Sequence, residues 1–251
     1  MGERLGYDSV QVMGVSVTDL YFDVGAEAGH VRQFPCGSDL SIFKHCFVSV
    51  VLFAHLVWDI GANTAWRVGL SHLQTSPQDR TYTDLVTDSF SGRSRLWVVD
   101  GILKWSPSGN PTEKNFKLQG EYFRRNESGN LTYNAAGAAQ TDSYASRQSG
   151  YYIQSVYQFM PQWRAGYRYD RLSAGTTSIG LVNSGALKAA DFPILNAYNP
   201  TRNTFMVDWS PSEFSRLRLQ YARDRPQFGT ADNQVFLQYI MSLGAHGAHK
   251  F

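Results

Sequence analysis

Two closely spaced arginine pairs, Arg164 with Arg168 and Arg216 with Arg218, could create a site for anions. Side chains an even number of residues apart lie on the same face of a β-strand, so each pair would present two guanidinium groups to one side. Rings of basic side chains attract anions. The competing interpretation is that these arginines pair with acids on neighbouring strands and only stiffen the sheet. We favour anion attraction slightly, because the two pairs are locally unbalanced in charge.

Two other groups of residues could do metal or redox chemistry. His246 and His249 are the only closely spaced histidines, and neutral imidazole is a good zinc ligand. Two ligands do not complete a zinc site, so the simpler interpretation is an exposed tail. Cys36 and Cys46 could close a small disulfide loop in an oxidising compartment, or they could be two unrelated thiols.

The sequence does not indicate an enzyme. It contains no glycine-rich phosphate loop, nucleophile elbow or HExxH helix, and we expect no cofactor. The net charge is only +2 and no basic run is present, so no nucleic-acid partner is expected either. The charged residues must therefore be positioned by some regular arrangement of the chain.

That arrangement is a set of strands, because apolar and polar residues alternate with a period of two in ten segments, with an eleventh candidate near Val10–Ser16. Leu217, Leu219 and Tyr221, for example, alternate with Arg216, Arg218 and Gln220. A soluble core could not bury so many charges without partners, whereas a water-filled lumen could hold them. The residues predicted to line such a pore are Arg67, Lys104, Lys117, Glu121, Arg164, Arg168, Asp170, Asp208, Arg216 and Arg218.

The tryptophans indicate a bilayer around these strands. Five of the six lie within a few residues of a short turn: Trp58, Trp66, Trp105, Trp163 and Trp209. Indole rings prefer the headgroup boundary to water or hydrocarbon, so we expect these five to form a membrane-interface band. No apolar run reaches about 18 residues, so no transmembrane helix is expected.

The connections between strands predict an orientation. Segments 74–94, 125–149, 172–201 and 224–234 are rich in Gly, Ser, Asn, Asp, Thr and Arg, and we expect them to be long loops. Outer-membrane barrels have long extracellular loops and short periplasmic turns. Segment 43–58 loses the two-residue period, and is either a buried strand or the product of an altered local gene sequence.

We therefore predict an all-β fold: an antiparallel transmembrane β-barrel with about 10–12 strands present. Residues 1–251 would form one domain, with a poorly defined start at 1–19 and a C-terminal tail at 245–251. The start of the chain lacks the basic and apolar regions of a signal peptide. We expect the chain to be the C-terminal part of a larger barrel.

The last strand, Val235–Gly244, and the terminal Phe251 resemble the end of Gram-negative outer-membrane barrels of the porin superfamily. The positions two, four and six before Phe251 depart from that pattern, being His249, Gly247 and Ala245, so the spanning strand would end near Leu243. The run 163–170 and the tail 244–249 resemble a proteobacterial porin group described as zinc-regulated. The resemblance implies a bacterial outer-membrane location, lipid contact, and assembly machinery that recognises the last strand.

The leading functional hypothesis is a passive channel for small hydrophilic solutes or ions, with a basic lumen that favours anions. One alternative is the barrel of a TonB-dependent active-transport receptor, with or without a role in zinc transport, although such barrels need about 22 strands. Another is a structural or adhesive barrel that works through its loops. Self-association into a homo-oligomer is left open, and the sequence does not identify the transported solute.

Overall fold

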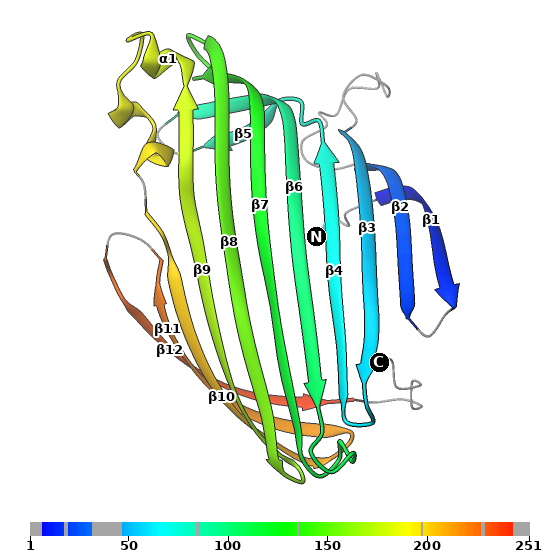
Figure 1. Ribbon diagram of the computed structural model, residues 1–251. Coiled ribbons are helices and arrows are strands. Elements are labelled where there is room, and N and C mark those ends of the chain that lie inside the picture. Colours follow the sequence, from blue (N-terminus) through cyan, green and yellow to red (C-terminus); the bar gives the residue numbers. More distant parts are fainter. Residues whose placement is uncertain are drawn as a thin grey trace.

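One antiparallel sheet makes up almost all of the computed structural model, which describes residues 7–17, 20–31, 47–83, 86–134, 136–196, 198–226 and 229–242 (Figure 1). The strands are β1 (Tyr7–Val17), β2 (Tyr21–Val31), β3 (Phe47–Ile60), β4 (Thr64–Thr75), β5 (Arg80–Thr83), β6 (Thr87–Trp105), β7 (Asn115–Tyr133), β8 (Gln140–Met160), β9 (Trp163–Ile179), β10 (Thr201–Ser212), β11 (Ser215–Arg225) and β12 (Asp232–Met241). Three single helical turns follow β9: α1 (Gly180–Asn183), η1 (Ala189–Asp191) and η2 (Pro193–Leu195). None of the helices in the described ranges is long and apolar enough to cross a membrane.

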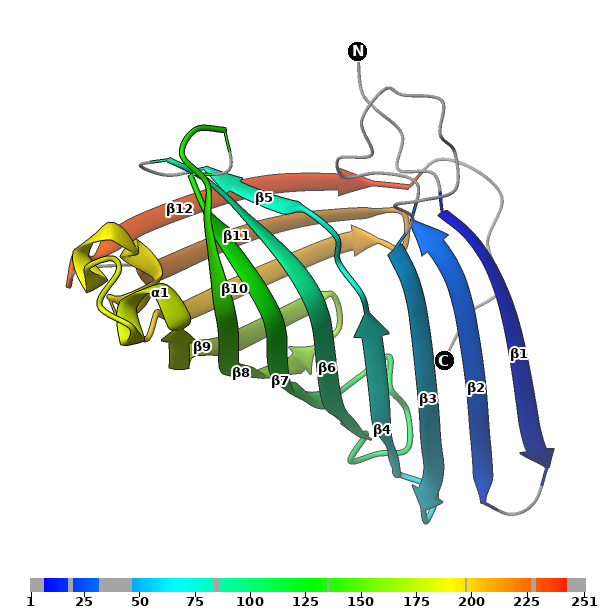
Figure 2. The ribbon, with the colours of Figure 1, turned by 90° about the horizontal axis from the view of Figure 1, so that it is seen from above.

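The sheet is an up-and-down meander. Its order is β1-β2-β3-β4-β6-β7-β8-β9-β10-β11-β12, and β5 pairs only with β6. Seen from above, the sheet curves into a trough (Figure 2). The predicted all-β antiparallel fold and the predicted strand number are confirmed, since the sheet has 12 strands. Within the described part of the chain the sheet is not closed, because β1 and β12 do not pair with each other.

The predicted extent of the long loops was wrong. Strands β6 to β9 contain 19, 19, 21 and 17 residues, so they run through much of segments 74–94 and 125–149. The connection between β7 and β8 is limited to 134–139. The polar and small side chains there favoured a loop, but strand pairing is made by the backbone: Gly129 pairs with Gly92 on one side and Tyr144 on the other.

The ambiguous segment 43–58 is a strand where the structure describes it, because β3 begins at Phe47. It is not buried, since Val50 and Leu52 are 37% and 49% exposed. Its two-residue period is hidden in the sequence because both of its faces carry apolar side chains. Val51, Phe53 and Val57 occupy the face opposite to Val50 and Leu52.

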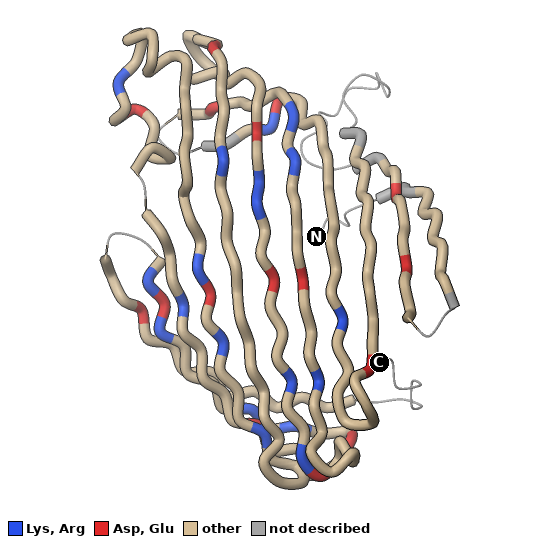
Figure 3. Tube along the Cα trace, in the orientation of Figure 1, with Lys and Arg blue, Asp and Glu red and all other residues tan. Residues whose placement is uncertain are grey.

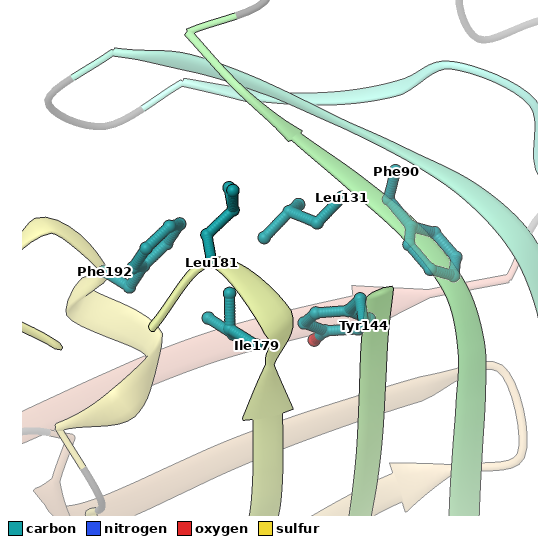
Figure 4. Packing of buried hydrophobic residues seen from close by; sticks show 6 residues of the cluster. All are labelled: Phe90, Leu131, Tyr144, Ile179, Leu181 and Phe192. Atoms are coloured by element: carbon teal, nitrogen blue, oxygen red, sulfur yellow. The ribbon is translucent and has the colours of Figure 1, made fainter. Parts of the chain in front are cut away.

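The buried core is small and lies at the long-loop end of the sheet (Figure 4). It contains Phe90, Leu131, Tyr144, Ile179, Leu181 and Phe192. Phe90 and Tyr144 meet edge to face with ring centroids 5.2 Å apart, and Phe192 meets Tyr133 in the same way at 5.3 Å. Apolar packing within this cluster holds the helical segment after β9 against the sheet.

We predict that Phe192→Ala loosens segment 180–196. The Phe192 side chain is only 2% exposed, and deleting a buried phenylalanine ring typically costs about 3–5 kcal/mol. Trypsin cleavage after Lys188 should accelerate, because it follows local opening of this segment. Ile194→Ala is the matched control, since Ile194 lies in the same segment and is 42% exposed. Equal cleavage rates in the two variants would contradict the proposed role of Phe192.

Candidate functional site

The strand register divides the sheet into two chemically different faces. Across β6 and β7, Leu103 lies opposite Leu118 on one face and Lys104 lies opposite Lys117 on the other. We call these the apolar face and the polar face. The apolar face leaves many large side chains exposed: Val10, Val12, Phe22, Val24, Val50, Leu52, Val68, Leu70, Val99, Leu118, Ile153, Phe205, Val207, Leu217, Leu219, Val235 and Leu237.

All five tryptophans predicted to form a band lie on the apolar face, at the short-turn end. Trp58 pairs with Trp66 across β3 and β4, with ring centroids 6.0 Å apart. Trp163 stacks on Trp209 across β9 and β10 at 6.1 Å. Trp105 lies opposite Phe116. The structure thus gathers the five into one row, while their contact with a membrane interface remains a prediction.

A second aromatic row, which sequence reasoning missed, bounds the apolar face at the long-loop end. It consists of Trp97, Tyr122, Tyr151, Tyr169 and Tyr221, one from each of β6, β7, β8, β9 and β11. On β6 the two rows are separated by the span from Trp97 to Trp105, which is close to the 9–11 residues of a tilted transmembrane strand. The signal in the sequence was that these aromatics are the last large apolar residues on their face before it becomes polar.

All ten residues predicted to line a pore lie on the polar face. A cavity of about 720 Å³ opens there over β8 to β11 and is lined by Arg168, Asp170, Arg202 and Arg218 among others. A second cavity of about 590 Å³ lies at the short-turn end and is lined by Arg164, Arg216 and Ser210 among others. The structure therefore brings the two arginine pairs to a concave, polar surface.

Asp208 is the centre of the first charge cluster. Its side chain is 1% exposed, and it lies opposite both Arg164 on β9 and Arg218 on β11. The Arg218 guanidinium donates two hydrogen bonds to this carboxylate, at 2.7 and 2.9 Å, and Arg216 approaches it to 3.9 Å. One carboxylate cannot satisfy three guanidinium groups, and the buried Nε atoms of Arg164 and Arg216 have no hydrogen-bond partner.

The second cluster is well paired. Arg168 donates hydrogen bonds to both carboxylate oxygens of Asp170, the shortest at 2.6 Å, and its guanidinium lies 3.7 Å from the centre of the Tyr152 ring. The Tyr152 hydroxyl in turn donates to Glu121 at 2.9 Å. For Arg168 the structure therefore favours the wall-stiffening interpretation over free anion attraction.

The third group lies on β4, β6 and β7. Arg67 is paired with Asp100 at 3.0 Å. Lys104 and Lys117 lie directly opposite each other, and neither ammonium group has a hydrogen bond or ion pair with any residue in the described ranges. Arg164 likewise has none in this part of the chain. The unpaired cations Lys104, Lys117 and Arg164 all lie in the half of the polar face nearest the short turns, and Asp59 on β3 lies on the same face near its short turn.

The other candidate chemistry falls outside the described residues. His246, His249, Cys36 and Cys46 all lie there, so their predicted roles stay predictions. Within the described ranges, no group of three or more His, Cys, Asp or Glu residues is placed to hold a metal ion.

Comparison with known proteins gives two similarities. No family model matches the chain. An uncharacterized protein of Aquifex aeolicus (strain VF5) is 29% identical over 173 residues, covering 65% of this chain and 32% of that protein, so the match spans about a third of the relative's length. The crystal structure of the toluene transporter TodX of Pseudomonas putida aligns with 93% of this chain and 73% of its own, at 12% identity and a TM-score of 0.42.

We predict that Leu219→Arg is costly and that Gln220→Arg is tolerated. The Leu219 side chain is 55% exposed on the apolar face, whereas Gln220 lines the polar cavity. An arginine at the bilayer midplane of a lipid-facing strand costs roughly 2–4 kcal/mol. The free energy of unfolding from lipid vesicles, measured with denaturant, should fall by that amount only for Leu219→Arg. Equal losses would mean that the apolar face does not contact lipid.

We also predict that Asp208 is far more important for stability than Asp100. Asp208→Asn would leave Arg164, Arg216 and Arg218 without a counter-charge, and breaking such a buried pair typically costs about 3–5 kcal/mol. Asp100→Asn should cost under about 1 kcal/mol, because its partner Arg67 is 43% exposed. Removing Arg218 as well, in an Asp208→Asn, Arg218→Gln double variant, should recover part of the loss. Denaturant unfolding in micelles measures the free energy of unfolding of all three variants. Similar losses in Asp208→Asn and Asp100→Asn would contradict the greater importance of Asp208.

Proposed function

We propose that this chain forms part of the wall of a bacterial outer-membrane channel that passes small hydrophilic solutes with a modest preference for anions. The observation that supports this most directly is the pair of opposite faces on one sheet. One face exposes an apolar band bounded by two aromatic rows, and the other holds charged side chains and cavities. Lipid would cover the first and water would fill the space beside the second.

A closed wall would need further strands. The path from β1 to β12 contains 11 strands, since β5 lies off it, and all neighbours are antiparallel. In such a meander the first and eleventh strands run in the same direction, so joining β1 to β12 would be a parallel pairing. Bacterial single-chain barrels have an even number of antiparallel strands. We therefore propose that at least one more strand completes the wall.

The proposed orientation places the short turns toward the periplasm and the long-loop end outside the cell. The unpaired cations Lys104, Lys117 and Arg164 would then lie in the periplasmic half of the channel. A low-dielectric wall focuses their field into the lumen, which raises the local concentration of anions. The nearby carboxylates of Asp59, Asp100 and Asp208 keep the expected selectivity modest.

A passive, porin-like channel suits these features better than either alternative. A TonB-dependent receptor has about 22 strands, twice the number on the path here, so half of its wall would have to lie beyond these strands. A zinc-related function would depend on His246 and His249, which stay a prediction. A structural or adhesive barrel differs from a channel in having no conductance. Recognition of β12 by the assembly machinery, and formation of a homo-oligomer, are also proposals.

The test is the reversal potential of the full-length channel in planar bilayers under a salt gradient. Lys117→Glu with Arg164→Glu should shift it toward cation selectivity, because both side chains are unpaired cations on the polar face. Arg168→Glu with Arg218→Glu would be less informative, because both arginines are paired with acids. Lys114→Glu is the matched control, since Lys114 is exposed in the turn before β7 and lies outside the strands.

Two outcomes would contradict different parts of the proposal. An unchanged reversal potential with normal conductance would mean that the cations are wall residues and that the channel is not charge-selective. A correctly inserted protein without conductance would exclude the channel and favour a structural or adhesive role.

A further inference from the structure

Seven arginines share the register positions of the apolar face, at its long-loop end. They are Arg93, Arg95, Arg124, Arg147, Arg171, Arg223 and Arg225, from β6, β7, β8, β9 and β11. All seven side chains are exposed. In Figure 3 the upper parts of β6, β7 and β8 carry basic residues, while further basic residues of β6 and β7 lie near the short turns. We call this set the outer arginine row.

The outer arginine row begins directly beyond the second aromatic row. On β7, β9 and β11 the next side chain on the same face after the tyrosine is an arginine: Tyr122 is followed by Arg124, Tyr169 by Arg171 and Tyr221 by Arg223. On β6, Arg95 follows Trp97 in the same way, and on β8 a single serine separates Tyr151 from Arg147. Between the two aromatic rows of β6 to β11, the described strands carry no Lys or Arg on this face.

The row has no counter-charge among the residues that the structure describes. None of its seven side chains makes a hydrogen bond or ion pair with any residue in the described ranges. The acids of β2 to β12 all occupy positions on the polar face: Asp23, Glu27, Asp59, Asp88, Asp100, Glu121, Glu127, Asp142, Asp170, Asp208, Asp224 and Asp232. On the polar face Arg67, Arg168 and Arg218 are by contrast paired with acids. A binding partner of the outer row must therefore supply the negative charge.

The position of the row identifies that partner. Lipid covers the apolar face if the proposed function holds, and aromatic rows lie at the headgroup boundary. Side chains one step farther from the hydrocarbon reach the level of the headgroup phosphates. The planar guanidinium group matches phosphate oxygens with two parallel hydrogen bonds. We propose that the outer arginine row binds the phosphate groups of lipid headgroups in the leaflet at the long-loop end.

This inference rests on the membrane location proposed above, and goes beyond it by assigning a lipid class to one leaflet. Zwitterionic headgroups would leave seven positive charges unbalanced, whereas a multiply phosphorylated glycolipid would neutralise them. Each Lys or Arg near an anionic membrane surface contributes about 1 kcal/mol of attraction. Three arginines together should therefore change affinity by roughly a hundred-fold, because 1.4 kcal/mol corresponds to a factor of ten.

The experiment measures binding of lipid A, a glycolipid with two phosphates, to the full-length protein in zwitterionic detergent micelles. Arg124→Gln, Arg171→Gln and Arg223→Gln would be combined in one variant. We expect its affinity for lipid A to fall roughly a hundred-fold. The matched control removes three cations from the polar face, by Arg67→Gln, Lys104→Gln and Lys117→Gln, and should leave the affinity unchanged. Replacing the same three arginines of the outer row with Lys keeps the charge, and should give an intermediate affinity because the two-pronged contact is lost.

The readouts separate this inference from the proposed function. Equal lipid A affinity in the outer triple variant and the unsubstituted protein, with conductance intact, would overturn the lipid inference and leave the channel standing. Equal losses in the outer and polar-face triple variants would also overturn it, since they would show a general effect of net charge. Absence of conductance in the unsubstituted protein would instead contradict the channel. If the Gln triple variant does not fold, the Lys triple variant and the three single Gln variants are measured instead. Lipid A affinities equal to that of the unsubstituted protein in all of them would reject phosphate recognition by the row.

Discussion

The continuous ladder of backbone hydrogen bonds between neighbouring strands is the interaction on which the rest of this structure depends. The molecule has a very small buried core, so side-chain packing cannot hold the sheet together along its length. The ladder does so without reference to side-chain chemistry, and it pairs the backbone groups of each inner strand with those of both neighbouring strands. Because it imposes a strict two-residue period, it also decides which side chains share a surface. The separation into an apolar and a polar face follows from it directly.

That period explains how much could be predicted from the sequence. The side of a residue in a strand depends only on whether its number is odd or even, so all ten predicted polar-face residues lie together and the five tryptophans form one row. The period could not reveal where strands end, because Ser, Gly, Asn and Thr can sit in a long ladder as well as in a loop. It also could not reveal cross-strand partners. Those depend on register, and the bulges between Arg147 and Ser149 and between Trp209 and Ser212 shift the register locally.

Pairing of charges divides the polar face into two parts with different properties. Around Arg168, Asp170 and Tyr152, every charge has a close partner, and the side chains there are held in fixed positions. Near the short turns, the guanidinium groups of Arg216 and Arg218 share the buried carboxylate of Asp208, Arg164 lies opposite it without an ion pair, and two lysines face each other. Like charges that close repel unless an anion or water separates them. The first part is therefore suited to holding the wall in shape, and the second to interacting with passing solutes.

The unequal strand lengths give the wall an uneven rim. Strands β6 and β7 have 19 residues, whereas β1, β2 and β11 have 11. Eight further residues at about 3.3 Å each extend a strand by roughly 26 Å. In the proposed orientation, the extended ends of β6 and β7 would therefore project beyond the shorter strands on one side of the channel mouth. A molecule approaching the cell from outside would then meet these ends ahead of the shorter strands β1, β2 and β11, and would find a surface whose shape is set by the backbone.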